Sequence, residues 1–358
     1  MAYLLKKHTD AERGILIFNQ KEWDAFSQIK SLPHIRDNYI FGCHVGRFWK
    51  NCDWNGSKIS QFNFYMSSRN QLPENFLGEI IELNSRNFTP EIFSYLGEVK
   101  DIDILWINKP HPVKNIEKFL ISLKNLFQTY GYFRTVIVAA ISPNELKRPQ
   151  DFFDVELFIR QNSVIFGDFV TLIRTTGDGN EGAPNHTMAQ YFKRSKIFAF
   201  YSEAEGESRV VTEALCCGCK IVYFDRVQGG SNDYCNSQNS LQFTNYDDSH
   251  LILKTAIDTF SVPDISQIHQ KCHQNNSIGS LIDYFKNELY PKLGLSWIND
   301  NLEIPSGKWS NGKDKLALNF SLPGHDHNVP WKHPDLETGD LVGDRKFIDI
   351  FLKETGLH

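Results

Sequence analysis

Residues 198–224 read FAFYSEAEGESRVVTEALCCGCKIVYF, and this stretch indicates the fold most clearly. It begins and ends with short apolar runs, Phe198–Tyr201 and Lys220–Phe224, whose length is typical of buried strands. Between them the sequence predicts a polar turn and a helix over about residues 208–217, which Gly218 ends. Two strands joined through one helix form a βαβ unit, and such units build parallel sheets.

The turn before this helix carries the first candidate site. Ligands of parallel sheets lie at the carboxyl ends of the strands, and the first amides of a helix attract anions. We therefore expect an anionic ligand above Gly206. Glu205 lies at the mouth of the helix, whereas Glu213 lies about a turn and a half inside it. The alternative is that both are ordinary surface glutamates, because acids are favoured near helix N-termini anyway.

A longer pattern surrounds these two acids. The string S-x-x-E-G, followed after six residues by E-A-L-x-x-G-x-x-I-V, resembles the donor-site signature of retaining GT-B glycosyltransferases of family 4, known for its E-x7-E motif. The sequence departs from it at Glu207, where the family has an aromatic residue, and at Ser208, where it has a second glycine. The matching residues are Ser202, Glu205, Gly206, Glu213, Ala214, Leu215, Gly218, Ile221 and Val222.

A second βαβ unit is predicted upstream. Its strands are Asp103–Ile107 and Thr135–Ile141, and its helix runs from Asn115 to about Tyr130 with apolar residues along one stripe. Gly131 ends this helix.

Two lysines occupy the loop between the first strand and the helix of this unit. Lys109 and Lys114 would follow the carboxyl end of a strand, where two cations suit a diphosphate. The loop also resembles the family pattern R-L-x-P-x-K-G/N-I, with Lys109 in the arginine position and Lys114 in the lysine position. The alternative is a solvated pair of loop lysines.

The resemblance covers residues 101–260. Within this range the sequence further predicts a helix over 151–161, a strand over 169–174 and a helix over 186–195. In the family, the donor-site signature is followed by a glycine pair, a strand and a helix with the pattern D-x-x-x-L-x-x-A-I. The residues that resemble this part are Gly229, Gly230, Asn239, Leu241, Asp247, Leu251 and Ala256.

The first hundred residues are less regular. Strands are predicted over 14–18, 38–46, 61–67 and 79–83, with helical spacing over 21–29, which indicates a small α/β domain. In the family this is the position of the acceptor domain, here shorter than usual. His44 lies near the end of the predicted strand 38–46, where a family histidine near the transferred sugar would lie; a structural role is the alternative.

The composition narrows the class of protein. The chain has 358 residues, room for two domains, and a formal net charge of −5, which disfavours a nucleic-acid partner. No apolar signal core or bilayer-spanning run is present, so a cytoplasmic protein is expected. Peripheral contact with a membrane is compatible with the family, whose acceptors are often lipid-anchored. The seven cysteines indicate buried thiols rather than a zinc site.

The last third of the sequence contains one clear element and a weak metal pattern, and a second weak metal pattern lies at residues 101–103. Residues 277–294 predict an amphipathic helix that crosses back to the first domain. The later histidines lie among prolines and glycines at a spacing typical of no standard metal site. The D-x-D spacing of residues 101–103 falls at the start of a predicted strand, which favours a structural role. These histidines are His325, His327 and His333.

Together these patterns predict an α/β protein with parallel sheets, and the resemblance implies the GT-B-like class with two Rossmann-like domains. The expected divisions are a short acceptor-side domain over 1–100, a donor domain over 101–276, and a crossing helix and tail over 277–358. The resemblance implies a metal-independent, retaining glycosyltransferase that uses a nucleotide diphosphate sugar as donor and transfers the sugar to a glycan, lipid-linked or other hydroxyl acceptor. It needs no further cofactor.

The resemblance also implies roles for single residues. Glu213 would hold the ribose hydroxyls, Glu205 would orient the donor sugar, and Lys109 with Lys114 would stabilise the departing diphosphate. Amides from Gly206, Glu207, Ser208 and Arg209 would add to that stabilisation. The main alternative is a non-catalytic nucleotide-sugar-binding protein of the same fold; a dinucleotide oxidoreductase is disfavoured because no G-x-G-x-x-G follows a strand.

Overall fold

The chain divides into two compact units in a computed structural model. Unit 1 comprises Met1–Phe88 with Gln274–His358, and unit 2 comprises Thr89–His273. The ranges that the structure describes are 2–19, 26–27, 30–45, 61–68, 72, 76–83, 85–141, 152–175, 184–205, 208–300 and 302.

Unit 2 is built on a six-stranded sheet in which every strand pair is parallel. Its strand order is β11-β10-β9-β6-β7-β8, so the chain starts in the middle, builds one half and then returns to build the other. The strands are β6 (Ile102–Asn108), β7 (Thr135–Ala139), β8 (Val170–Arg174), β9 (Ser195–Phe200), β10 (Lys220–Phe224) and β11 (Ser240–Phe243).

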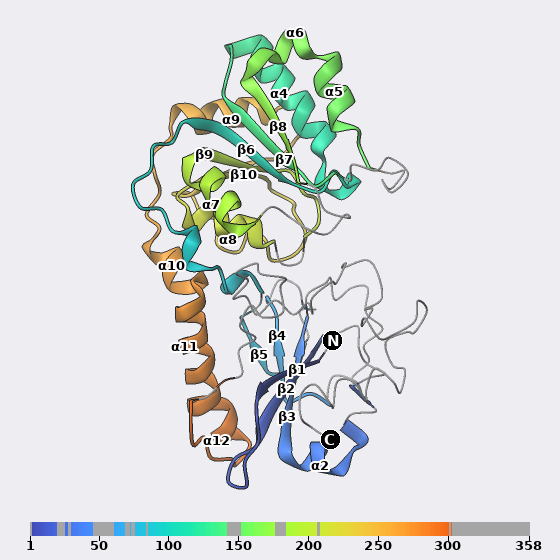
Figure 1. Ribbon diagram of the computed structural model, residues 1–358, viewed down its shortest axis with the longest axis vertical. Coiled ribbons are helices and arrows are strands. Elements are labelled where there is room, and N and C mark those ends of the chain that lie inside the picture. Colours follow the sequence, from blue (N-terminus) through green and yellow to red (C-terminus); the bar gives the residue numbers. More distant parts are fainter. Residues whose placement is uncertain are drawn as a thin grey trace. The chain divides into compact units, whose positions relative to one another are not determined.

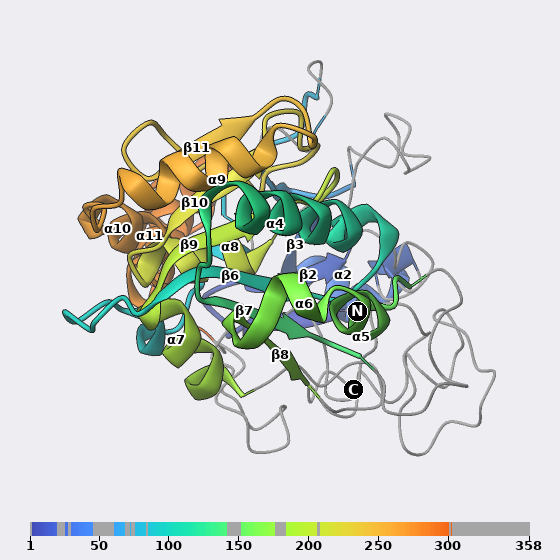
Figure 2. The same ribbon diagram turned by 90° about the horizontal axis from the view of Figure 1, so that it is seen from above.

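Helices cover both faces of this sheet, because β6 is apolar on both sides and alternate residues enter different cores. Ile104 and Trp106 pack with α4 (Ile116–Tyr130), α5 (Val155–Gln161), α6 (Ser163–Phe166) and α9 (Ser249–Asp258). Leu105 and Ile107 pack with α7 (Asn185–Arg194), α8 (Arg209–Cys216) and α10 (Ser266–Cys272). Figure 2 shows α4 and α9 side by side over the sheet.

The amphipathic stripe of α4 shows why this unit folds as predicted. Its six apolar positions at helical spacing are all buried, and each large apolar side chain that is buried contributes about 1.5–3 kcal/mol. Gly131, at φ +92°, ends the helix in a conformation that disfavours other residues. The buried stripe consists of Ile116, Phe119, Leu120, Leu123, Leu126 and Phe127.

Unit 1 contains a five-stranded sheet in the order β1-β2-β3-β4-β5 (Figure 1). Strands β2 to β5 are parallel, whereas β1 and β2 form an antiparallel hairpin. The elements are β1 (Ala2–Lys6), β2 (Gly14–Asn19), α2 (Pro33–Asn38), β3 (Tyr39–His44), β4 (Phe64–Met66), β5 (Ile80–Ile81), α11 (Gln274–Tyr284), the π-helical turn η8 (Phe285–Leu289) and α12 (Tyr290–Lys292).

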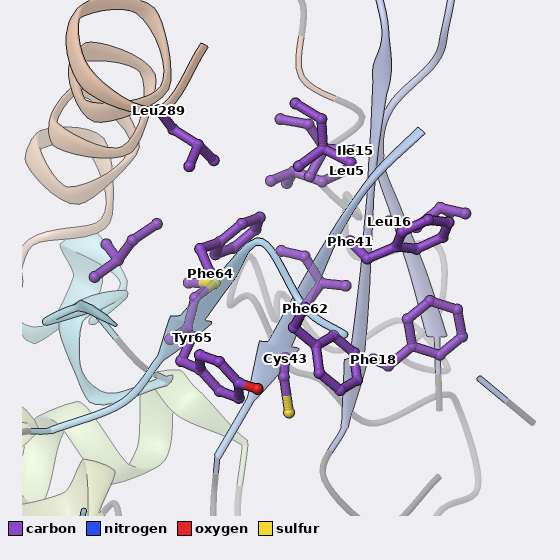
Figure 3. Packing of buried hydrophobic residues seen from close by; sticks show 14 of the residues in the cluster. Leu5, Ile15, Leu16, Phe18, Phe41, Cys43, Phe62, Phe64, Tyr65 and Leu289 are labelled. Carbon is purple, nitrogen blue, oxygen red and sulfur yellow. The ribbon is translucent and has the colours of Figure 1, made fainter. Parts of the chain in front are cut away.

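The C-terminal helical segment completes the core of unit 1. Leu281, Phe285 and Leu289 are fully buried against the strands. Figure 3 shows Leu289 pointing from its helix toward the sheet side chains, among them Ile15 and Phe64.

Four elements and one boundary differ from the sequence-based expectation. Strand β1 and helices α2, α6 and α10 are additional, because their short runs lack a clear period. The boundary near residue 100 lies instead at 88/89, since the segment after it bonds within unit 2: the Thr89 amide donates to Cys272 O at 2.8 Å and the Tyr95 amide to Cys216 O at 3.1 Å.

Candidate active site

The strand order of unit 2 places the two predicted loops next to each other. β6 and β9 are parallel neighbours, yet the chain leaves them in opposite directions across the sheet, toward β7 and toward β10. This is the topological switch point, where open parallel sheets bind ligands outside the carboxyl ends of their strands. The loop with Lys109 and Lys114 follows β6, and the loop with Glu205 follows β9.

An ion pair and a backbone hydrogen bond join these loops. Lys114 Nζ pairs with the Glu205 carboxylate, and the Glu203 amide donates to Val113 O at 3.1 Å. The side chains of Lys114 and Glu205 are 14% and 23% exposed, so both are largely enclosed but within reach of solvent. Two side chains singled out separately in the sequence therefore meet in the fold.

The environment of Lys114 favours the exchange of this partner for a stronger anion. Burial, and after it repulsion from Lys109, lowers the pKa of Lys114 to about 8. Lys109 is half-buried and lies close enough to Lys114 to repel its charge. A diphosphate carries more negative charge than one carboxylate and can face both lysines.

The β10–β11 loop fixes the turn that carries Glu205. The Glu205 amide donates to Gln228 O at 2.9 Å, and the Ser231 hydroxyl donates to Glu205 O at the same distance. Ser231 Oγ also accepts a hydrogen bond of 3.2 Å from the Ser208 amide. The Ser208 amide, expected to face the phosphate, is thus already bonded within the protein, because the buried Ser231 hydroxyl lies against it. Gly206 and Glu207 lie outside the described residues.

Helix α8 carries Arg209 and Glu213 one turn apart. Arg209 Nη2 and Glu213 Oε1 are 3.2 Å apart, and the Glu213 side chain is buried. Glu213 is therefore no ordinary surface glutamate. Its carboxylate is held by Arg209, which gives Arg209 a side-chain contact in addition to the backbone role expected for it.

Three residues that the sequence did not single out support the same loops. Asn115 Nδ2 donates to Tyr201 O at 3.1 Å and to the Tyr246 hydroxyl at 3.0 Å. Tyr246 Oη in turn donates to Tyr201 O at 3.2 Å. The one available signal was an asparagine at the start of a predicted helix, since asparagine tolerates positive φ. Nothing local points to the tyrosines.

The other predicted residues lie elsewhere. His44 is buried as the last residue of β3 in unit 1, and its role stays a prediction. Asp101 pairs with Arg134 at 2.6 Å and Asp103 with Lys196 at 2.7 Å, so the D-x-D spacing has a structural role, as expected. His325, His327 and His333 fall outside the described residues.

The cysteines of α8 and its C-terminal turn are buried thiols. Burial raises the pKa of Cys216 and Cys217 well above the ordinary thiol value and that of Cys219 to about 11, so all three are protonated and unreactive near neutrality. In the described part of the chain, no three His, Cys, Asp or Glu side chains converge on a point that could hold a metal ion.

None of the helices among the described residues is both long and apolar enough to span a lipid bilayer.

Comparison with known proteins identifies solved structures with a similar architecture. The sequence matches no family model and no curated protein. Among solved structures, TarM matches with a TM-score of 0.55 and 15% identity over 79% of this chain and 56% of its own. The pneumococcal O-GlcNAc transferase GtfA, in complex with UDP and GlcNAc, gives 0.51 and 11% over 72% of this chain and 54% of its own.

A third similar structure is the sucrose-phosphate synthase of Thermosynechococcus elongatus, with a TM-score of 0.52 and 12% identity over 76% of this chain and 73% of its own. The chain thus spans about half the length of TarM and GtfA. At these identities the likeness establishes the architecture: the chain has the α/β fold of GT-B glycosyltransferases, with two Rossmann-like units that contain parallel sheets.

Proposed function

We propose that this chain is a retaining, metal-independent glycosyltransferase of the family 4 type. It moves a sugar from a nucleotide diphosphate sugar to a hydroxyl group of a glycan, lipid-linked or other acceptor. The observation that carries this proposal is the meeting of Lys109, Lys114 and Glu205 at the switch point of the unit 2 sheet. Two enclosed cations at the carboxyl ends of parallel strands are what a diphosphate leaving group requires.

The chemistry rests on positioning and charge stabilisation. As the bond between the sugar and the diphosphate breaks, negative charge develops on the bridging oxygen, and Lys109 with Lys114 neutralises it. Glu205, released from Lys114 by the arriving diphosphate, orients hydroxyls of the donor sugar. Glu213, held by Arg209 at 3.2 Å, accepts hydrogen bonds from the ribose. The acceptor hydroxyl then attacks the sugar, and its proton leaves with the departing diphosphate.

A thermal-shift screen tests the donor site. Purified protein is heated with UDP, GDP, ADP and CMP and with their sugar conjugates, and the screen is repeated on Glu213→Ala. We expect one diphosphate to raise the melting temperature of the wild type and to lose most of this effect in the variant. Glu98→Ala is the matched control, because Glu98 pairs with Lys193 at 3.3 Å and both residues precede their strands, at the opposite edge of the sheet, so the ligand response should stay unchanged.

A second candidate is a non-catalytic nucleotide-sugar-binding protein. It is favoured by the internal partners of two groups expected to bind phosphate: Lys114 pairs with Glu205, and the Ser208 amide bonds to Ser231. Release of nucleoside diphosphate from the donor, in the presence of candidate acceptors, separates the two. Binding without release would favour the second candidate, and no shift with any nucleotide would contradict both.

A further inference from the structure

We propose that Asn115 is a positioning residue: it fastens the β6–α4 loop to the carboxyl ends of β9 and β11 and thereby keeps Lys114 opposite Glu205. The fastening is a property of the fold. Its effect on diphosphate binding rests on the proposed function.

The backbone of Asn115 has an unusual conformation. Its φ of 51° and ψ of 40° place it in the left-handed region, and it is the one non-glycine residue with positive φ in the described ranges. Asparagine enters this region more readily than most residues. The chain can therefore turn between Lys114 and the first residue of α4, while Asn115 O accepts the Phe119 amide at 3.0 Å.

The side chain of Asn115 joins three strand ends. It follows β6, whereas its acceptors Tyr201 and Tyr246 follow β9 and β11. The carboxamide nitrogen has two hydrogens, so it can make both bonds at once. Burial raises the pKa of the Tyr246 phenol, which therefore keeps its proton and donates it to Tyr201 O at 3.2 Å. One carbonyl oxygen thus receives two hydrogen bonds.

Lys114 and Glu205 lie close in the sequence to the residues that the Asn115 side chain joins. Lys114 directly precedes Asn115, and Glu205 follows Tyr201 by four residues. The backbone bond from the Glu203 amide to Val113 O lies between them. Without the Asn115 side chain, the two segments are still joined by that backbone bond, by the Lys114–Glu205 pair and by the exposed pair of Lys118 in α4 with Glu203 at 3.0 Å, and all three contacts can open to solvent.

Hydrogen exchange of the Glu203 amide in the ligand-free protein tests the fastening. Asn115→Gly keeps the positive φ and removes the side chain. We expect the Glu203 amide to exchange about threefold to tenfold faster, the factor that one ordinary hydrogen bond provides. Asn115→Ala, which also strains the turn, should have a larger effect, and Tyr246→Phe a smaller one. Asn162→Gly is the control, because Asn162 Nδ2 bonds only locally to Phe158 O at 2.9 Å.

The dissociation constant of UDP at pH 7.5 tests the effect on the site. It should rise about threefold to tenfold in Asn115→Gly and stay unchanged in Asn162→Gly. Unchanged exchange at Glu203 would overturn the fastening. Faster exchange with unchanged UDP affinity would overturn the role in diphosphate binding. If the wild type binds neither inorganic pyrophosphate nor any of UDP, GDP and ADP, the proposed function and the binding role fail together, while the exchange experiment still decides the fastening.

Discussion

Each unit contains an enclosed lysine–glutamate pair, and the two pairs differ in what surrounds them. In unit 1, Lys6 and Glu12 are 3.2 Å apart with side chains 2% and 0% exposed. Lys6 also bonds to Asn299 and lies 3.9 Å from the centre of the Trp297 ring. In unit 2, Lys114 and Glu205 are 14% and 23% exposed, and Lys109 repels Lys114.

Glu12 is bonded as fully as Lys6. Its two oxygens accept hydrogen bonds from the Ile298 amide at 2.8 Å and from Asn299 Nδ2 at 3.0 Å. The unit 1 pair therefore joins the β1–β2 hairpin to the segment after α12, and exchange for a ligand would leave buried groups unsatisfied. The unit 2 pair is accessible to solvent, and the positive charge of Lys109 lies near Lys114. The surroundings of a pair, rather than its two residue types, separate a structural role from a binding role.

The largest expected effect concerns the unit 1 pair. Glu12→Gln leaves the Lys6 charge buried without a carboxylate, which should lower the stability of unit 1 by about 3–5 kcal/mol. Hydrogen exchange of the β2 amides should become faster by the corresponding factor. Asp37→Asn, which removes the exposed partner of Arg36, should leave that exchange unchanged. Equal small effects in both variants would contradict the distinction between the pairs.

Lys114→Ala should leave the fold intact and reduce transfer about 10²–10³-fold, the usual loss when a charge-stabilising group is removed. The measurement is the initial rate of nucleoside diphosphate release, together with the melting temperature. Lys196→Ala is a matched control, because Lys196 pairs with Asp103 at 2.7 Å near the opposite end of the sheet. A similar loss of rate in both variants would point to a general effect on unit 2.

Glu205→Gln sharpens the contrast, because the two members of the unit 2 pair should respond in opposite ways. Transfer should fall about 10–10²-fold, as the loss of a charged hydrogen bond to the sugar predicts. UDP itself should bind as tightly as before or more tightly, since Lys114 no longer has an internal carboxylate partner. Calorimetry measures this affinity, and weakened UDP binding would contradict an exchangeable pair.

The smallest effect is the pH dependence of affinity. Lys114, with its pKa near 8, is charged below that pH and neutral above it, so affinity for UDP should fall as the pH rises from 7.5 to 9.5. A fall of about tenfold would correspond to 1.4 kcal/mol. The last phosphate pKa is near 6, so the charge of the diphosphate is constant over this range. Lys114→Arg keeps its charge and should abolish the slope; an equal slope in this variant would assign it to another group.

The elements of unit 2 were predicted more fully than those of unit 1 for a physical reason. Fully buried strands such as β7 and long amphipathic helices such as α4 repeat one pattern over many residues. In unit 1, β4 and β5 have three and two residues, and β1 is a short edge strand without alternation. Such short elements form because neighbouring strands and helices provide a surface to pack against. Contacts with segments distant in the sequence leave no pattern in the local sequence.

The sequence alone determined the alternation of strands and helices in unit 2 and placed Lys109, Lys114 and Glu205 in loops that follow strands. Only the tertiary structure decided that these loops meet. Every parallel strand ends at the same edge, and the local pattern does not say that β9 lies beside β6. The bonds of Asn115 to residues 86 and 131 positions away depend on that order, as does the Lys114–Glu205 pair. Local propensity forms the elements, whereas packing across the whole sheet selects their neighbours.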